Sequence, residues 1–193
     1  MKPIQFVVTI MLALLSFSSC QEDPCDNNLC ENGGICDDGK CLCPEGYTGN
    51  QCEEKILPYR MRISSVTLTR WPASIDGMQW DGTDGPDLFF KLYQDSLPIG
   101  KPLQLFMDAP IDQSYEFQIN LIEMRNITQR HYMKLFDYEG FNLTPEFMGE
   151  VEFIPYNVEN GLPETIVLDN GGPVAFVIGV TYLYPEETDL VDN

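Results

Sequence analysis

The stretch Cys25–Cys52 reads CDNNLCENGGICDDGKCLCPEGYTGNQC, and its six cysteines decide the fold of the first part of the chain. Their spacing is C-x4-C-x5-C-x4-C-x-C-x8-C. A segment this short buries too little apolar surface to fold on its own core. Disulfides can replace the core, because each restricts the unfolded chain and contributes about 2–4 kcal/mol. A zinc site is the alternative, and it is disfavoured because the stretch contains neither a C-x-x-C pair nor a histidine.

Three short motifs lie between these cysteines: the paired glycines Gly33-Gly34, the single residue Leu42, and Gly46-Tyr47-Thr48-Gly49. With them, the stretch resembles an EGF-like module over essentially its whole length. Cysteine number alone leaves several pairings open. The resemblance implies the pairing Cys25–Cys36, Cys30–Cys41 and Cys43–Cys52.

Some EGF-like modules bind calcium through an acidic pair before the first cysteine and a second motif between the third and fourth cysteines. Glu22 and Asp23 fit the first half of this pattern, but the four residues between Cys36 and Cys41 do not fit the second half. We therefore interpret residues 25–54 as a structural module.

Residues 1–19 have the composition of a targeting segment. Lys2 supplies a positive start, residues 4–15 are mostly apolar, and this run is shorter than the roughly twenty residues that span a bilayer. The residues before Cys20 resemble the lipobox of bacterial lipoproteins, which implies that Cys20 is lipidated. Cys20 is also the one left over of seven cysteines. The alternative is an ordinary secretory signal followed by a spare cysteine.

Residues 20–24 then form a lipidated N-terminus and a short acidic tether. The tether resembles a signal that places lipoproteins on the outer face of the outer membrane. We therefore expect a protein anchored by lipid to the outer membrane at the cell surface, with the periplasmic face as the alternative.

Residues 55–60 are expected to be a linker, and residues 61–184 a second domain with an acidic tail at 185–193. Alternating apolar residues, as in Val174-Phe176-Ile178-Val180-Tyr182, indicate strands with one buried face. Turn-forming residues separate them, so we predict a mainly β chain whose second domain is an eight-stranded antiparallel β-sandwich. The expected strands are 61–70, 88–93, 102–106, 115–122, 132–136, 149–153, 164–168 and 174–182.

Two loops of this domain concentrate carboxylates, one before residue 88 and one after residue 136. Close carboxylates repel one another unless a cation lies between them, and calcium takes six to eight oxygen ligands from flexible loops. The domain resembles a C2 domain, in which two such loops face each other and bind calcium. The resemblance implies a calcium site made by Asp81, Asp87, Asp137, Glu139 and Glu146, with Asp76 and Asp84 as alternatives to Asp81.

The formal net charge of −19 excludes a phosphate-backbone partner, because the chain has no basic surface to offer nucleic acid. Asp95-Ser96-Leu97 resembles an O-glycosylation site of bacterial surface proteins, which marks Ser96 as a candidate.

We expect a non-enzymatic surface lipoprotein, used in adhesion, whose C2-like domain binds calcium and a protein, glycan or membrane partner. A metal-free structural or assembly subunit is the alternative. A hydrolase that uses paired carboxylates, such as a glycosidase, is the third hypothesis.

Overall fold

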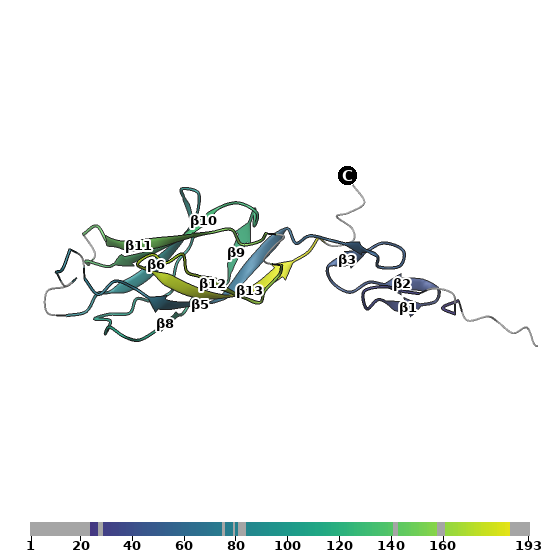
Figure 1. The fold of residues 1–193 in the computed structure, drawn as a ribbon, viewed down its shortest axis with the longest axis horizontal. Coiled ribbons are helices and arrows are strands. Elements are labelled where there is room, and N and C mark those ends of the chain that lie inside the picture. Colours follow the sequence, from purple (N-terminus) through teal and green to yellow (C-terminus); the bar gives the residue numbers. More distant parts are fainter. Residues whose placement is uncertain are drawn as a thin grey trace, which may run out of the picture. The chain divides into compact units, whose positions relative to one another are not determined.

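The computed structural model describes residues 24–26, 29–74, 76–78, 80, 84–140, 143–157 and 161–185. The chain divides into two compact units, Met1–Ile56 and Leu57–Asn193, and this division falls within the expected linker (Figure 1). In the part that the structure describes, every regular element is a strand. The same residues contain no helix that is long and apolar enough to cross a membrane.

The first unit is held by three disulfides, Cys25–Cys36, Cys30–Cys41 and Cys43–Cys52. This is the pairing that the resemblance to EGF-like modules implies. Strands β1 (Ile35–Asp37) and β2 (Lys40–Leu42) form a hairpin. Its two turn residues, Asp38 and Gly39, both have positive φ, as a tight two-residue hairpin turn requires. Strands β3 (Tyr47–Thr48) and β4 (Glu54–Lys55) form the other antiparallel pair of this unit.

The second unit is a sandwich of two antiparallel sheets (Figure 1). The first sheet has the order β11-β10-β6-β7. Its strands are β6 (Leu88–Gln94), β7 (Leu97–Gly100), β10 (His131–Asp137) and β11 (Glu146–Phe153). The second sheet has the order β12-β13-β5-β8, with β9 also paired to β5. Its strands are β5 (Arg60–Arg70), β8 (Tyr115–Phe117), β9 (Ile122–Arg125), β12 (Thr165–Leu168) and β13 (Ala175–Leu183).

The core lies between these sheets and is made by alternate residues of their strands. Phe90 of β6 contacts Phe117 of β8 and Phe176 of β13, with ring centroids 5.1 and 6.4 Å apart. Both Phe90 and Phe176 are fully buried. In β13 the residues expected to face inward are buried from Val174 to Tyr182. Burial of each large apolar side chain contributes about 1.5–3 kcal/mol, which makes this layer the main source of stability.

Two expected strands differ in the structure. Residues 102–106 are not a strand and make only isolated bridges, Leu88↔Phe106 and Pro102↔Ile119. The chain instead reverses at Asp95, which has positive φ, so the strand that pairs with β6 is β7, which begins at Leu97.

The expected strand 115–122 is divided into β8 and β9. Both pair with β5, but the chain takes five steps from Phe117 to Ile122 (122 − 117) while β5 takes three from Ile63 to Val66 (66 − 63). The two extra residues do not change the phase by themselves. The inward face changes because β5 carries an extra residue at Ser64 and buries both Ile63 and Val66, so Leu121 is 63% exposed and Ile122 is buried.

Candidate functional site

Carboxylates from three loops line one open cavity of about 410 Å³ in the second unit. Asp84 and Asp87 precede β6, Asp108 lies between β7 and β8, and Glu139 follows β10. The remaining lining residues are Tyr138 and Gly140, so no basic side chain offsets the negative charge of the lining. The four carboxylates of this lining repel one another when they are ionised.

Two carboxylates hold the loops around this cavity together. Asp137 is fully buried, and its Oδ1 accepts the backbone N–H of Asp87 at 2.6 Å. Asp87 Oδ1 accepts the backbone N–H of Asp108 at 2.9 Å, and the N–H of Tyr138 donates to the carbonyl of Asp87 at 2.9 Å. Backbone N–H groups therefore join the three loops by donating hydrogen bonds to a carboxylate or to a backbone carbonyl.

The structure brings together only part of the expected calcium site. Asp87 and Glu139 line the cavity, as does the alternative residue Asp84. Asp137 adjoins the cavity without lining it, and Glu146 lies opposite Asp137 on β11. Asp76 occupies a turn with positive φ and is not part of the lining either. Asp81 and Cys20 lie outside the described residues.

Asp108 is a lining residue that the sequence did not single out. It stands alone between Met107 and Ala109, in a stretch expected to follow a strand that does not form. Ala109 donates its backbone N–H to the carbonyl of Pro86 at 2.9 Å, and this bond brings the loop to the cavity. The sequence carries no signal for such a long-range contact.

The coordination of calcium sets a strict geometric requirement for such a lining. Calcium takes six to eight oxygens at about 2.3–2.6 Å, so several carboxylates must converge on one point. Among the residues that the structure describes, no three Asp, Glu, His or Cys side chains converge closely enough to hold a metal ion. The described carboxylates therefore surround a cavity without forming a closed calcium site.

A second cavity shares Asp84 and Asp108 with the first and is walled by Trp71 and Trp80. Trp80 Nε1 donates to the carbonyl of Pro72 at 2.9 Å, and both indoles pack against the hydrophobic core. These contacts give the two tryptophans a structural role at the base of the loops.

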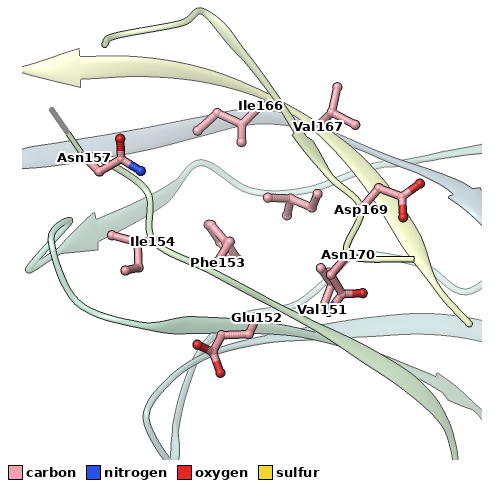
Figure 2. Close-up of a pocket in the computed structure, with 10 residues that line it drawn as sticks. Val151, Glu152, Phe153, Ile154, Asn157, Ile166, Val167, Asp169 and Asn170 are labelled. Atoms are coloured by element: carbon pink, nitrogen blue, oxygen red, sulfur yellow. The ribbon is translucent and has the colours of Figure 1, made fainter. Parts of the chain in front are cut away.

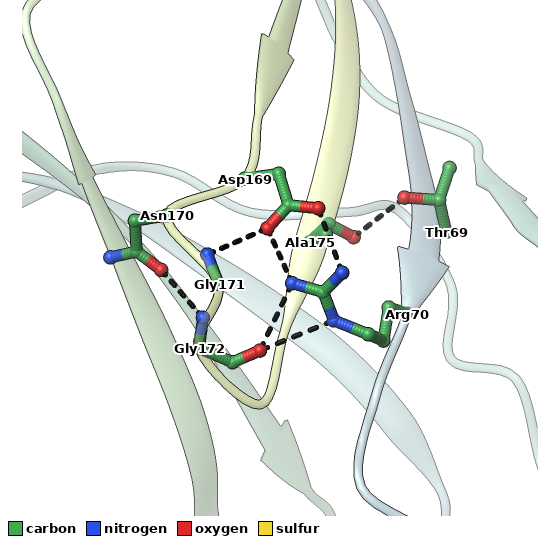
Figure 3. A network of polar contacts seen from close by, with 7 residues as sticks. All are labelled: Thr69, Arg70, Asp169, Asn170, Gly171, Gly172 and Ala175. Carbon is green, nitrogen blue, oxygen red and sulfur yellow. Dashed lines mark hydrogen bonds and ion pairs between the residues drawn. The ribbon is translucent and has the colours of Figure 1, made fainter.

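The turn between β12 and β13 is fixed by a network of charges (Figure 3). The Arg70 guanidinium makes a two-pronged ion pair with Asp169, in which Nη1 lies 2.7 Å from Oδ2, and its Nη2 donates to the carbonyl of Gly172 at 3.0 Å. Asp169 also accepts the N–H of Gly171 at 2.8 Å. The Arg70 hydrogen bond, followed by that of Gly171, lowers the pKa of Asp169 to about 2. This turn is thus attached to the end of β5.

Ser96 lies in the two-residue connection between β6 and β7. It is exposed, and its neighbours are Asp95, with positive φ, and Leu97, which is 65% exposed. The position is accessible in the way that a modification site requires.

Comparison with known proteins identifies the first unit. The family model described as EGF-like domain matches residues 20–52. Together with the three disulfides, this match shows that the first unit is an EGF-like domain. EGF-like domains occur in extracellular and cell-surface proteins.

Similar stretches occur in much longer proteins. Netrin-G1 of Homo sapiens is 53% identical over 38 residues, which cover 18% of this chain and 7% of netrin-G1. Fibropellin-1 of Strongylocentrotus purpuratus is 49% identical over 46 residues, 22% of this chain and 4% of fibropellin-1. Lactadherin of Rattus norvegicus is 42% identical over 50 residues, 23% of this chain and 12% of lactadherin. The chain thus spans at most 12% of the length of these three relatives.

Solved structures of C2 domains match the larger part of the chain. A C2 domain of a plant extended synaptotagmin 1 has a TM-score of 0.42 at 18% identity, covering 68% of this chain and 99% of that domain. A calcium-bound structure of two C2 domains of extended synaptotagmin 2 has a TM-score of 0.38 at 15% identity, covering 67% of this chain and 47% of that one. These values are too low to assign a function. What the structure establishes by itself is a mainly β chain, with an EGF-like domain and an antiparallel sandwich.

Proposed function

We propose that this chain is a non-enzymatic, adhesion-type surface protein in which the EGF-like domain is a spacer and the C2-like sandwich is the binding unit. The observation that supports it most strongly is the EGF-like domain, whose three disulfides require an oxidising compartment outside the cytosol. Lipidation at Cys20 would anchor the chain to the outer membrane, at the cell surface or at the periplasmic face. The binding partner would be a protein, a glycan or a membrane.

We further propose that the acidic cavity binds calcium weakly, through Asp84, Asp87, Asp108 and Glu139. A lining that contains four carboxylates favours a cation, whereas the lack of convergence argues against a tight, preformed site. The affinity expected is that of extracellular calcium modules, a Kd of about 10⁻⁴–10⁻³ M.

A metal-free structural or assembly subunit is the second candidate. Two observations favour it: Asp137 and Asp87 already accept backbone N–H groups, and the described carboxylates do not converge. In this alternative the cavity is solvated surface, and its carboxylates serve only to join the loops.

Thermal unfolding of the full-length chain, followed by tryptophan fluorescence, distinguishes the candidates. Trp71 and Trp80 are the only tryptophans, so the signal reports the second unit alone. A ligand stabilises only the state that binds it, so 10 mM calcium should raise the midpoint by about 3–6 °C relative to chelator. Magnesium should raise it much less, because it demands a near-ideal octahedral site.

The double substitution Asp84→Asn with Asp108→Asn should abolish the calcium effect. The matched control is Glu116→Gln with Glu164→Gln, which removes the same charge from exposed positions away from the cavity and should preserve the effect. Coincident unfolding curves in calcium, magnesium and chelator would instead select the metal-free candidate.

A further inference from the structure

The sandwich is open along one side, between the edge strands of its two sheets. β11 ends the first sheet and β12 ends the second, and each pairs with a single neighbour among the described strands. On the opposite side, a Cβ on Gly100 of β7 would lie only 2.6 Å from the Ile122 side chain of β9, so that side is closed. The open side holds a groove of about 340 Å³, within the size range of ligand pockets.

The floor of this groove is apolar and belongs to the core (Figure 2). Val151 and Phe153 of β11 and Leu168 of β12 are almost fully buried, and Ile166 packs against the same core. Above this floor Ile154 remains 42% exposed. The apolar surface that the groove offers to a ligand is therefore that of Ile154 and Val167, since the floor beneath them is almost fully buried.

The backbone of β12 faces this groove with unused hydrogen-bonding groups. Val180 donates its N–H to the carbonyl of Glu164 at 2.8 Å, and hydrogen-bonded pairs alternate along an antiparallel ladder. The residues bonded to β13 are thus Ile166 and Leu168, while the N–H and C=O groups of Thr165 and Val167 point away from it.

This edge is short, at four residues, but it lacks the other features that block strand addition. Residues 165–168 contain no proline, no lysine and no bulge, and Val167 is 68% exposed. The turn that follows β12 is held by the ion pair between Arg70 and Asp169, so the edge is fixed at that end. A fixed edge costs a partner strand little ordering of the protein.

Charge decides which strand fits. The polar lining residues are Glu152, Asn157, Asp169 and Asn170. Glu152 is paired with Arg130 and Asp169 with Arg70, so the charge preference comes from the net charge of the chain and not from these two carboxylates. The chain as a whole carries a formal charge of −19, which opposes pairing with a second copy. A partner segment with flanking lysine or arginine residues has the complementary charge.

We propose that this groove binds an extended, basic segment of a partner protein, which adds a strand to β12 and places an apolar side chain against the exposed Ile154. This β-strand addition gives affinity through backbone hydrogen bonds and specificity through the groove. It rests on the proposed function only in that the chain is a binding protein, and it requires neither calcium nor the lipid anchor.

The probe is a labelled decapeptide of alternating valine and threonine with paired lysines at both ends, titrated against the full-length chain in chelator. Fluorescence anisotropy should show saturable binding, and replacing the lysines of the peptide by glutamates should weaken it about tenfold or more. Val167→Pro should weaken it by a similar factor, because proline removes the outward N–H without breaking a bond to β13. Val167→Thr keeps that N–H and should bind within about twofold of the original chain.

Ile154→Lys provides a second variant that leaves β12 untouched and fills the groove with charge, so it should also weaken binding about tenfold. Tryptophan fluorescence checks that each variant is folded. Leu103→Ser removes an exposed apolar side chain elsewhere and should change nothing. Asp84→Asn with Asp108→Asn should bind the peptide normally, which separates this groove from the acidic cavity.

Absence of saturable binding to the original chain would overturn the proposal, as would binding that Val167→Pro and Ile154→Lys both leave unchanged. Light scattering tests whether a second copy of the chain occupies the edge of β12 instead. A dimer that Val167→Pro converts to a monomer would show that a second copy, and not a partner segment, covers the edge.

Discussion

His131 is the only histidine of the chain and is fully buried at the start of β10. Its Nδ1 lies 3.0 Å from the carbonyl of Gln129, to which it donates, while its Nε2 has no hydrogen-bond partner within the described residues. Burial lowers the pKa of the imidazole, and the Gln129 bond offsets this only in part. The folded chain therefore keeps this group neutral at a pH at which the unfolded chain protonates it.

This predicts stability that is full above about pH 6.5 and falls as the pH drops toward the lowered pKa of the folded state. Urea unfolding at pH 7.5, 6.5 and 5.5 should show the decline. His131→Phe should flatten it, while changing stability at pH 7.5 by less than about 1.5 kcal/mol. An unchanged decline in the variant would assign the pH dependence to other groups.

For single residues, the sequence predicts which residue types form the candidate site better than it predicts where each of them lies in the structure. The acidic loops lie beside the cavity as expected for Asp84, Asp87 and Glu139. Asp137 has the same chemistry, but the alternation of β10 places it inward, where it bonds to Asp87. Asp108 joins the cavity through a contact between loops that are distant in sequence, and local pattern carries no information about such contacts.

At the scale of elements, period-two alternation located the long strands β10 and β13 well, because each buries one complete face. It failed where the chain changes phase. Burial moves from the odd Phe117 to the even Ile122 because β5, with which both strands pair, itself changes phase between Ile63 and Val66, and this pairing is a long-range property. β7 was missed because Leu97–Gly100 is short, contains proline and glycine, and reads as a turn.

Gly85 tests how the loops meet at the acidic cavity. A Cβ at this position would lie 2.4 Å from the carbonyl oxygen of Ala109 and 2.8 Å from the carbonyl carbon of Asp108, which are backbone atoms that cannot rotate away. Gly85→Ala should therefore separate the two loops and destabilise the second unit by about 1–3 kcal/mol, measured by urea unfolding with tryptophan fluorescence. Gly77→Ala measures backbone strain without a clash, since a Cβ there meets nothing within 4 Å but its positive φ disfavours any side chain. Equal stability of Gly85→Ala and the original chain would mean that this loop contact is loose.

At the scale of the whole molecule, the two units are stabilised by different interactions. The EGF-like domain depends on covalent cross-links, as small domains with little core do. The sandwich has no cysteine after Cys52 and depends on the buried layer around Phe90 and Phe176.

Under the proposed function, lipidation of Cys20 would determine where the protein is held. The six cysteines of the EGF-like domain pair with one another, and the chain contains seven, so Cys20 has no disulfide partner left within the chain. Acyl chains on this residue would hold the protein at a bilayer, because each buried CH₂ contributes about 0.8 kcal/mol and two or more chains give stable anchoring. In a bacterial host, the original chain should therefore appear in the outer-membrane fraction and incorporate labelled palmitate. Cys20→Ala should lose the label and leave that fraction, while Cys43→Ala with Cys52→Ala, which removes a disulfide and not the anchor, should keep the label.

Protease added to intact cells then distinguishes the two faces of the membrane, since only a surface-exposed chain is cleaved. An unlabelled original chain recovered as soluble protein would replace the anchor with an ordinary secretory signal.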